Sequence, residues 1–223
     1  MADERWERLA AATGIVFVIL GVVAYLLAGQ PPTPEDPATE VVAYHVDNRD
    51  SLLMSNYLWG LAGIFYFWFL GSLRSALRRA EGDTGRLSAV AFGAGIAGGV
   101  VFTIGVVVST AIASRVAGTA SEELTVALHD VASQAFHFAG FAFVVLAAAT
   151  SLVGGRFQAF PAWLGWLGWL VVIFSLLGTA PVFVDSGPLA AGGALSYVGF
   201  GLFFLWFLGL SVDLTRRAGR PST

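Results

Sequence analysis

Residues 87–113 read LSAVAFGAGIAGGVVFTIGVVVSTAIA, an apolar run without a single charged side chain. A helix needs about 20 such residues to cross the hydrocarbon core of a bilayer, which is ~30 Å thick. The strands of a membrane barrel would instead alternate apolar and polar residues. The run therefore predicts a membrane-spanning helix, and it decides the fold class.

Five further stretches have the same character. Only 12% of the residues are charged, against roughly 25% in soluble domains, and the mean hydropathy is +0.75. We predict an all-α, integral membrane bundle of six helices that forms a single domain over residues 1–223. The expected spans are residues 9–29, 52–73, 87–113, 126–153, 161–181 and 190–212.

The arginines predict how the bundle is oriented. All 12 basic residues are arginines, and those in one set of alternate loops are only Arg49 and Arg115. The others lie at the N-terminus, in residues 74–86 and 154–160, and in the C-terminal tail. Because cytoplasmic loops carry the excess of arginine, both termini are expected in the cytoplasm. All three histidines then fall on the outer side.

The missing residue types exclude several kinds of chemistry. The chain has no cysteine, which excludes disulfides and thiolate metal sites. It has no lysine, which excludes a lysine imine. No basic cluster is suited to following a nucleic-acid backbone.

The outer loop, residues 30–51, is the longest connection. Its proline-rich start is expected to be extended. Asp36 and Pro37 are typical of an N-cap and a first helical residue, so we predict a short interfacial helix that ends near Asn48. Its apolar residues, such as Val41, are expected to rest on the bilayer surface.

Three further patterns concern packing between helices. Gly95 and Gly99 have a G-x-x-x-G spacing, and they predict close helix contact, as do Gly165 and Gly168. Thr119 and Glu122 have the spacing of a capping box, so the fourth helix is expected to begin near Ser121. The tryptophans at every third position of residues 163–169 indicate either an interfacial belt or an aromatic binding wall.

Two segments match one another within the chain. Residues 63–80 and 201–218 share nine of eighteen positions without gaps, and both helices are expected to run from the outside to the inside. Two explanations fit: a parallel repeat relating the second and sixth helices, of the kind found in transporters, or the common composition of apolar spans that end in arginines.

A polar stripe enters the fourth span in residues 128–140, LHDVASQAFHFAG. At 100° per residue, Asp130, Gln134 and His137 share one helix face. Ionisable residues within a span usually face the bundle interior or a watery cavity. We therefore predict a ligand site in the outer half, formed by Asp130, Ser133, Gln134, His137, Asn56, Tyr57, Trp59 and Tyr197.

Three interpretations of this stripe compete. In the first, the polar residues only specify helix packing. In the second, they line an outward-open pocket for a hydrophobic small molecule or lipid-like ligand. In the third, the candidate metal ligands His45, His129 or His137, together with a carboxylate such as Asp130, bind a metal such as zinc for hydrolysis, although the chain has no H-E-x-x-H motif.

The first two interpretations lead to the function that we expect. It is a non-catalytic protein without a cofactor, which binds a lipid-like ligand, a membrane-protein partner or a second copy through its outer half. The lipid bilayer is its surrounding partner. The alternative is a metal-dependent intramembrane hydrolase that uses the outer histidines.

Several phrases carry a resemblance that covers nearly the whole chain. The outer loop ends in VVAYHVDNRDSLL, the second span ends in arginines, and the fifth begins FPAWLGWLG. In these features the chain resembles a group of actinobacterial multi-pass membrane proteins known only as a domain of unknown function. The resemblance implies a six-helix protein of the bacterial cytoplasmic (inner) membrane and assigns no catalytic residues.

Overall fold

The protein is described by a computed structural model that covers residues 2–82, 85–184, 187, 189 and 194–218, apart from the side chains of residues 2–4 and 194–197. The described residues form helices joined by turns and loops, and they contain no strand. The helices are α1 (Ala2–Ala28), α2 (Ala38–Asp47), α3 (Arg49–Glu81), α4 (Arg86–Ala111), α5 (Glu122–Phe157), α6 (Ala162–Leu177) and α7 (Ala194–Arg217). A π-helical turn, Ile112–Val116, extends α4, and a 3-10 turn, Ala180–Val182, follows α6.

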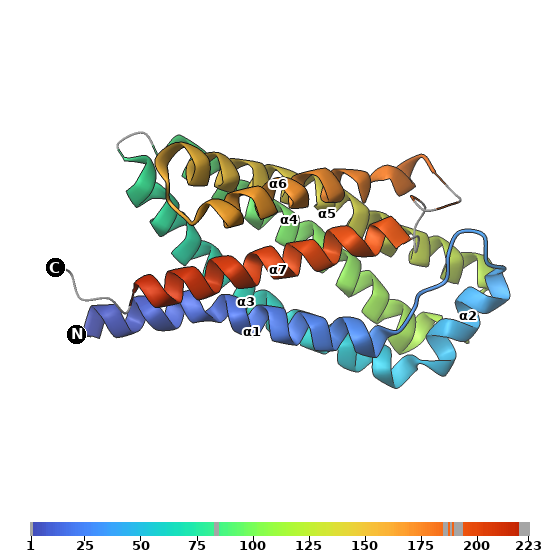
Figure 1. The fold of residues 1–223 in the computed structure, drawn as a ribbon. Coiled ribbons are helices and arrows are strands. Elements are labelled where there is room, and N and C mark those ends of the chain that lie inside the picture. Colours follow the sequence, from blue (N-terminus) through green and yellow to red (C-terminus); the bar gives the residue numbers. More distant parts are fainter. Residues whose placement is uncertain (1, 83–84, 185–186, 188, 190–193, 219–223) are drawn as a thin grey trace.

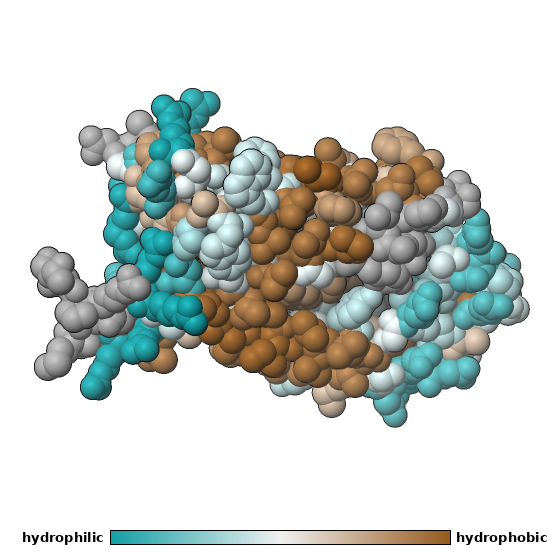
Figure 2. Space-filling view, in the orientation of Figure 1, coloured by the Kyte–Doolittle hydropathy of each residue, from teal (hydrophilic) through white to brown (hydrophobic). Residues whose placement is uncertain are grey.

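Six of these helices are long and apolar enough to cross a membrane. They are α1, α3, α4, α5, α6 and α7, and they coincide with the predicted spans. On the face shown in Figure 2, an apolar band crosses the middle of the molecule, and hydrophilic side chains gather at both ends. The all-helical, multi-pass prediction is therefore confirmed, and residues 190–193 of the expected sixth span lie outside the described residues.

The six spanning helices form a closed ring in chain order. Each packs against the spanning helices before and after it, and α7 packs against α1 to close the ring. Both ends of the chain lie at the same end of the bundle, while α2 lies at the opposite end (Figure 1). We call the end that carries α2 the outer end, following the predicted orientation.

Aromatic side chains fill the middle of the ring. Phe17 of α1 and Tyr66 of α3 meet with ring centroids 5.1 Å apart, and Tyr66 stacks on Phe207 of α7 at 5.5 Å. The Tyr66 hydroxyl donates a hydrogen bond to the Gly95 carbonyl of α4 at 2.9 Å. This aromatic layer joins helices from opposite sides of the ring.

Glycines of α4 set the rotation of α5. A Cβ at Gly98 would lie 2.6 Å from the ring of Phe143, and a Cβ at Gly105 would lie 2.6 Å from the ring of Phe136. Only glycine leaves room for these two α5 rings against α4. The prediction for Gly95 is confirmed as well, because a Cβ there would lie 2.9 Å from the Leu70 side chain.

The glycines of α6 differ from one another. A Cβ at Gly168 would collide with the Ser151 hydroxyl, so this glycine is a close-packing position, as predicted. A Cβ at Gly165 would meet nothing within 4 Å, so the packing prediction for Gly165 is wrong. Gly165 is partly exposed.

The outer loop contains the expected short helix, with a different start. Pro37 is the N-cap residue of α2, whereas the Asp36 carboxylate accepts a hydrogen bond from the backbone N–H of Thr33 at 2.6 Å. Asp36 therefore closes a turn before the helix and does not cap it. Val41 is buried, because α2 packs on α5 and α3, so this face of α2 does not rest on lipid.

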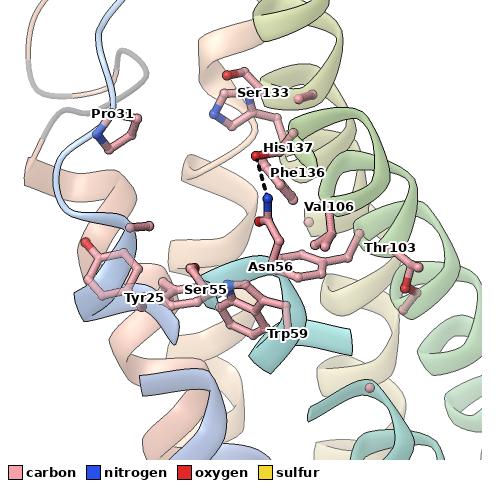
Figure 3. Close-up of a pocket in the computed structure, with 18 of the residues that line it drawn as sticks. Tyr25, Pro31, Ser55, Asn56, Trp59, Thr103, Val106, Ser133, Phe136 and His137 are labelled. Atoms are coloured by element: carbon pink, nitrogen blue, oxygen red, sulfur yellow. Dashed lines mark hydrogen bonds between the residues drawn. The ribbon is translucent and has the colours of Figure 1, made fainter. Parts of the chain in front are cut away.

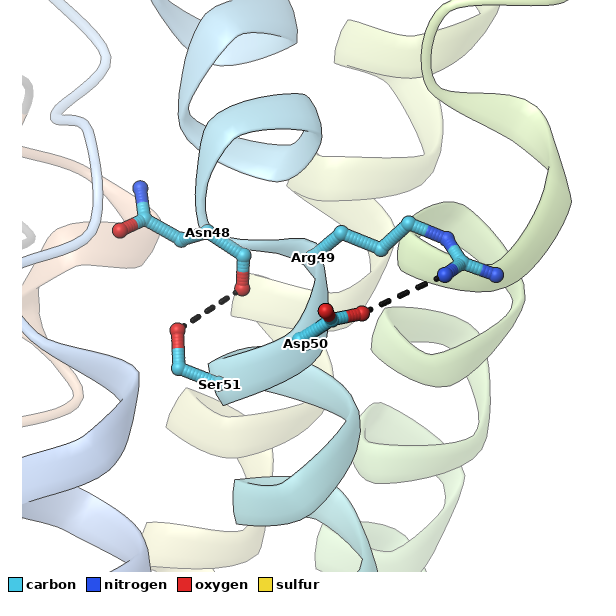
Figure 4. Close-up of polar contacts among 4 residues, drawn as sticks. All are labelled: Asn48, Arg49, Asp50 and Ser51. Carbon is cyan, nitrogen blue, oxygen red and sulfur yellow. Dashed lines mark hydrogen bonds and ion pairs between the residues drawn. The ribbon is translucent and has the colours of Figure 1, made fainter.

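Asn48 separates α2 from α3. The Ser51 hydroxyl donates to the Asn48 carbonyl at 2.9 Å, and Arg49 pairs with Asp50 at 3.4 Å, both on the exposed side of this corner (Figure 4). At the start of α5, Ser121 is the N-cap and accepts from the Leu124 N–H at 3.3 Å. The predicted start is confirmed, with Ser121 as the capping residue in place of Thr119.

The matching segments of α3 and α7 lie on either side of α1. Phe69 and Phe207 are equivalent positions, both are fully buried, and their ring centroids are 4.7 Å apart. Trp68 and Trp206 are also equivalent, but Trp68 is 51% exposed and Trp206 only 1% exposed. The internal repeat stays a prediction.

Candidate ligand-binding cavity

The outer half of the ring encloses a cavity of about 550 Å³. All six spanning helices, α2 and the loop before α2 contribute to its lining. The volume is within the range of ligand sites, about 300–1,000 Å³. The aromatic layer forms the inner floor, through Phe17, Tyr66, Phe143 and Phe203.

Aromatic and small residues make up most of the walls. Trp59 of α3 meets Phe102 of α4 with ring centroids 4.8 Å apart, and Phe102 meets Phe136 of α5 at 4.9 Å. Phe200 and Phe204 of α7 complete this belt, with centroids 4.6 Å apart. Among the described residues that line the cavity, none is Asp, Glu or Arg, so the site suits an uncharged ligand.

Polar groups converge on one side of this apolar space. Asn56 of α3 donates to the Ser109 hydroxyl of α4 at 3.2 Å, which is the dashed line in Figure 3. His137 and Ser133 of α5 lie above Asn56 and Trp59 around the same space (Figure 3). The His137 Nδ1 atom is buried and has no hydrogen-bond partner in the described part of the chain.

The predicted stripe on α5 is divided by the structure. His137 and Ser133 line the cavity, as do Asn56 and Trp59 of α3, whereas Asp130 and Gln134 are exposed and do not line it. The physical reason is the rotation of α5, because placing Phe136 and Phe143 against the α4 glycines turns the face of Asp130 and Gln134 outward.

Two other predicted residues also lie elsewhere. Tyr57 is 65% exposed and does not line the cavity. The side chain of Tyr197 lies outside the described residues. The tryptophans of α6, Trp163, Trp166 and Trp169, are exposed and form no part of the cavity wall, which agrees with an interfacial belt.

Two histidines join α2 to α5 at the outer end of the cavity. The His45 Nε2 atom lies 3.1 Å from the His129 Nδ1 atom, and both residues line the cavity. The tautomers of the two rings decide which histidine donates in this contact.

Residues 29–37, which we call the strap, run from the end of α1 to α2 across this outer end. Gly29 and Pro31 of the strap line the cavity together with Tyr44 and His45 of α2. The Tyr44 hydroxyl donates to the Ala28 carbonyl at 2.8 Å and fastens α2 to the end of α1. The strap and α2 therefore cover part of the outer end of the cavity.

The metal interpretation required His45 to approach His129, and this contact is present. Two nitrogen ligands of a tetrahedral zinc ion, each bound at ~2.0–2.1 Å, would be separated by a similar distance. The described residues nevertheless contain no group of three His, Asp or Glu side chains that could hold a metal ion. The pair by itself supplies half of a closed zinc site.

Several residues that shape the cavity were not predicted from the sequence. Gly60, Gly63 and Thr103 line it, yet a glycine or threonine within an apolar span carries no signal of its own. The Asn56–Ser109 hydrogen bond was also not predicted, although Asn56 belongs to the predicted site.

No family model, curated protein or solved structure matches the chain.

Proposed function

We propose that this protein binds an uncharged, lipid-like molecule in the outer-half cavity and acts as a binding protein without a catalytic step. The observation that carries the proposal is a large aromatic cavity with a few polar groups on one side. The apolar body of the ligand would lie against Trp59, Phe102 and Phe200. Its polar group would lie near Asn56 and His137, whose buried Nδ1 atom has no hydrogen-bond partner among the described residues.

The size of the cavity supports this proposal. A volume of about 550 Å³ lies within the range of ligand pockets, about 300–1,000 Å³. A protein that served only as a scaffold would gain more by filling this space with side chains, because unfilled space forfeits packing contacts.

Native mass spectrometry of the full chain in lipid nanodiscs tests the proposal. We expect a bound molecule on the wild type, reduced occupancy in His137→Ala, and an unchanged spectrum apart from the mutational mass in Gln134→Ala. Gln134 is the matched control because it lies on the same helix, three residues away, and is exposed. A wild type without a bound molecule, or equal occupancy in the three proteins, would overturn the proposal.

A metal-dependent hydrolase remains the second candidate, and the His45–His129 contact favours it. Under this alternative the spectrum of the wild type would contain the mass of a zinc ion, and His45→Ala and His129→Ala would both lose it. His137→Ala would retain the ion, because His137 lies about two turns from His129 along α5. The same experiment therefore separates the two candidates.

A further inference from the structure

One wall of the cavity contains little side-chain volume. On α3, Gly60, Gly63 and Ile64 fall on one helix face and line the cavity. A Cβ at Gly60 or Gly63 would meet nothing within 4 Å, and Ile64 is 58% exposed on the surface of the bundle. The cavity thus reaches the membrane-facing surface beside α3.

The neighbouring helix contributes Thr103 to the same wall. The Thr103 hydroxyl donates to the Gly99 carbonyl of its own helix at 2.8 Å, so its proton is already engaged in a hydrogen bond. We call the opening framed by Gly60, Gly63 and Ile64 of α3 and by Thr103 of α4 the α3–α4 window. Its frame presents no ionisable side chain to lipid.

An apolar groove lies outside the window. It has a volume of about 310 Å³ and is lined by Phe67, Val100, Thr103, Ile104, Val107 and Val108. Phe67 and Thr103 line both the cavity and the groove, so the two spaces adjoin at the window. Both helices span the apolar band, which places the groove against the hydrocarbon of the bilayer.

The other ends of the cavity are less accessible over the described residues. The aromatic layer closes the inner floor, where Tyr66, Phe17 and Phe207 are buried. The strap and α2 cover part of the outer end, fastened by the Tyr44–Ala28 and His45–His129 contacts. A route through the window would let an apolar molecule pass from lipid to the cavity without crossing water.

We infer that a lipid-like ligand reaches the cavity sideways from the membrane, through the α3–α4 window, and that its apolar tail extends through the window into the groove. The inference rests on the proposed function and adds the ligand class and its route. The ligand is an uncharged amphiphile with a hydrogen-bonding head and at least one long apolar chain. The head lies near Asn56 and His137, and the chain lies between Phe67 and Thr103.

Exchange of oleyl alcohol between nanodiscs tests the route. Protein nanodiscs are mixed with nanodiscs that carry the alcohol, and native mass spectrometry follows its occupancy on the full chain with time. Gly60→Trp places a bulky ring at the window without a collision of its Cβ. Gly71→Trp is the matched control, because Gly71 lies on nearly the same face of α3, also has nothing within 4 Å of a Cβ, and does not line the cavity.

We expect the wild type and Gly71→Trp to acquire the alcohol at equal rates, and Gly60→Trp to acquire it about tenfold more slowly or less. Thr103→Phe blocks the window from α4 and is expected to have the same effect. If both window variants exchange at the rate of Gly71→Trp, the lateral route is wrong while the proposed function stands. If the wild type binds no oleyl alcohol, both the proposed function and the route fail.

Discussion

At the scale of single residues, His45 is an ionisable side chain buried where an apolar cavity meets the outer loop. Burial, followed by the neighbouring His129, lowers the pKa of His45 from 6.5 to about 4. The folded protein therefore holds this ring neutral at neutral pH, and the unfolded chain binds a proton first on acidification. The contribution of His45 to the free energy of unfolding is therefore fully present above about pH 6.5, and it is lost as the pH falls towards 4.

The first prediction follows from this shift. The thermal midpoint of the wild type in nanodiscs should fall between pH 7 and pH 5, and the decrease should be smaller in His45→Gln, which has no titrating ring. Circular dichroism at several pH values measures both slopes. Equal slopes in the two proteins would show that His45 does not carry the effect.

Gly168 and Gly165 allow a second prediction with a control on the same helix. Gly168→Ala should destabilise the protein by about 1–3 kcal/mol, because its Cβ would overlap Ser151 in a packed interface. Gly165→Ala should be neutral or stabilising by up to ~1 kcal/mol, since alanine is the better helix former. Thermal midpoints of the two variants check the difference, and a loss of stability in Gly165→Ala would contradict the assigned orientation of α6.

At the scale of elements, α2 lies outside the six spanning helices and packs on α5 and α3. The Tyr44 hydroxyl also bonds the end of α1, and His45 contacts His129 of α5. A short helix outside the spanning bundle opens more readily than the spanning helices, whose backbone groups are bonded within lipid.

Tyr44→Phe should therefore loosen α2. Loss of one hydrogen bond of about 1 kcal/mol is expected to speed hydrogen exchange of the α2 amides by about fivefold. Tyr57→Phe is the control, because Tyr57 is an exposed residue on the neighbouring α3. Exchange measured by mass spectrometry tests this, and unchanged exchange in Tyr44→Phe would show that other contacts hold α2.

At the scale of the whole molecule, both termini lie at one end of the bundle (Figure 1), and the arginines predict that this end is cytoplasmic. The chain has no cysteine, so single cysteines report the orientation directly. Glu40→Cys on α2 should react with a membrane-impermeant maleimide in intact cells. Glu7→Cys near the N-terminus should react only after the cells are opened, and the reverse pattern would invert the topology.

The sequence was enough to predict six helices long enough to cross a membrane and their approximate positions, although α3 continues to Glu81, beyond the predicted residues 52–73. These follow from charge-free runs such as residues 87–113, because a bilayer of fixed thickness needs a fixed length of apolar helix. It also located the starts of α2 and α5 to within a residue or two. The sequence did not identify the capping residues. Pro37, and not Asp36, is the N-cap of α2, and Ser121, and not Thr119, is the N-cap of α5.

Which face of each helix points inward depends on contacts between helices that exist only in the folded protein. In water, an apolar face must be buried, but lipid is as apolar as a protein core, so the pattern of apolar residues does not distinguish the two. Asp130, Gln134 and His137 share a helix face by spacing, yet only His137 lines the cavity. The rotation of α5 depends on Phe136 and Phe143 fitting against Gly105 and Gly98, contacts between helices that no local pattern reveals.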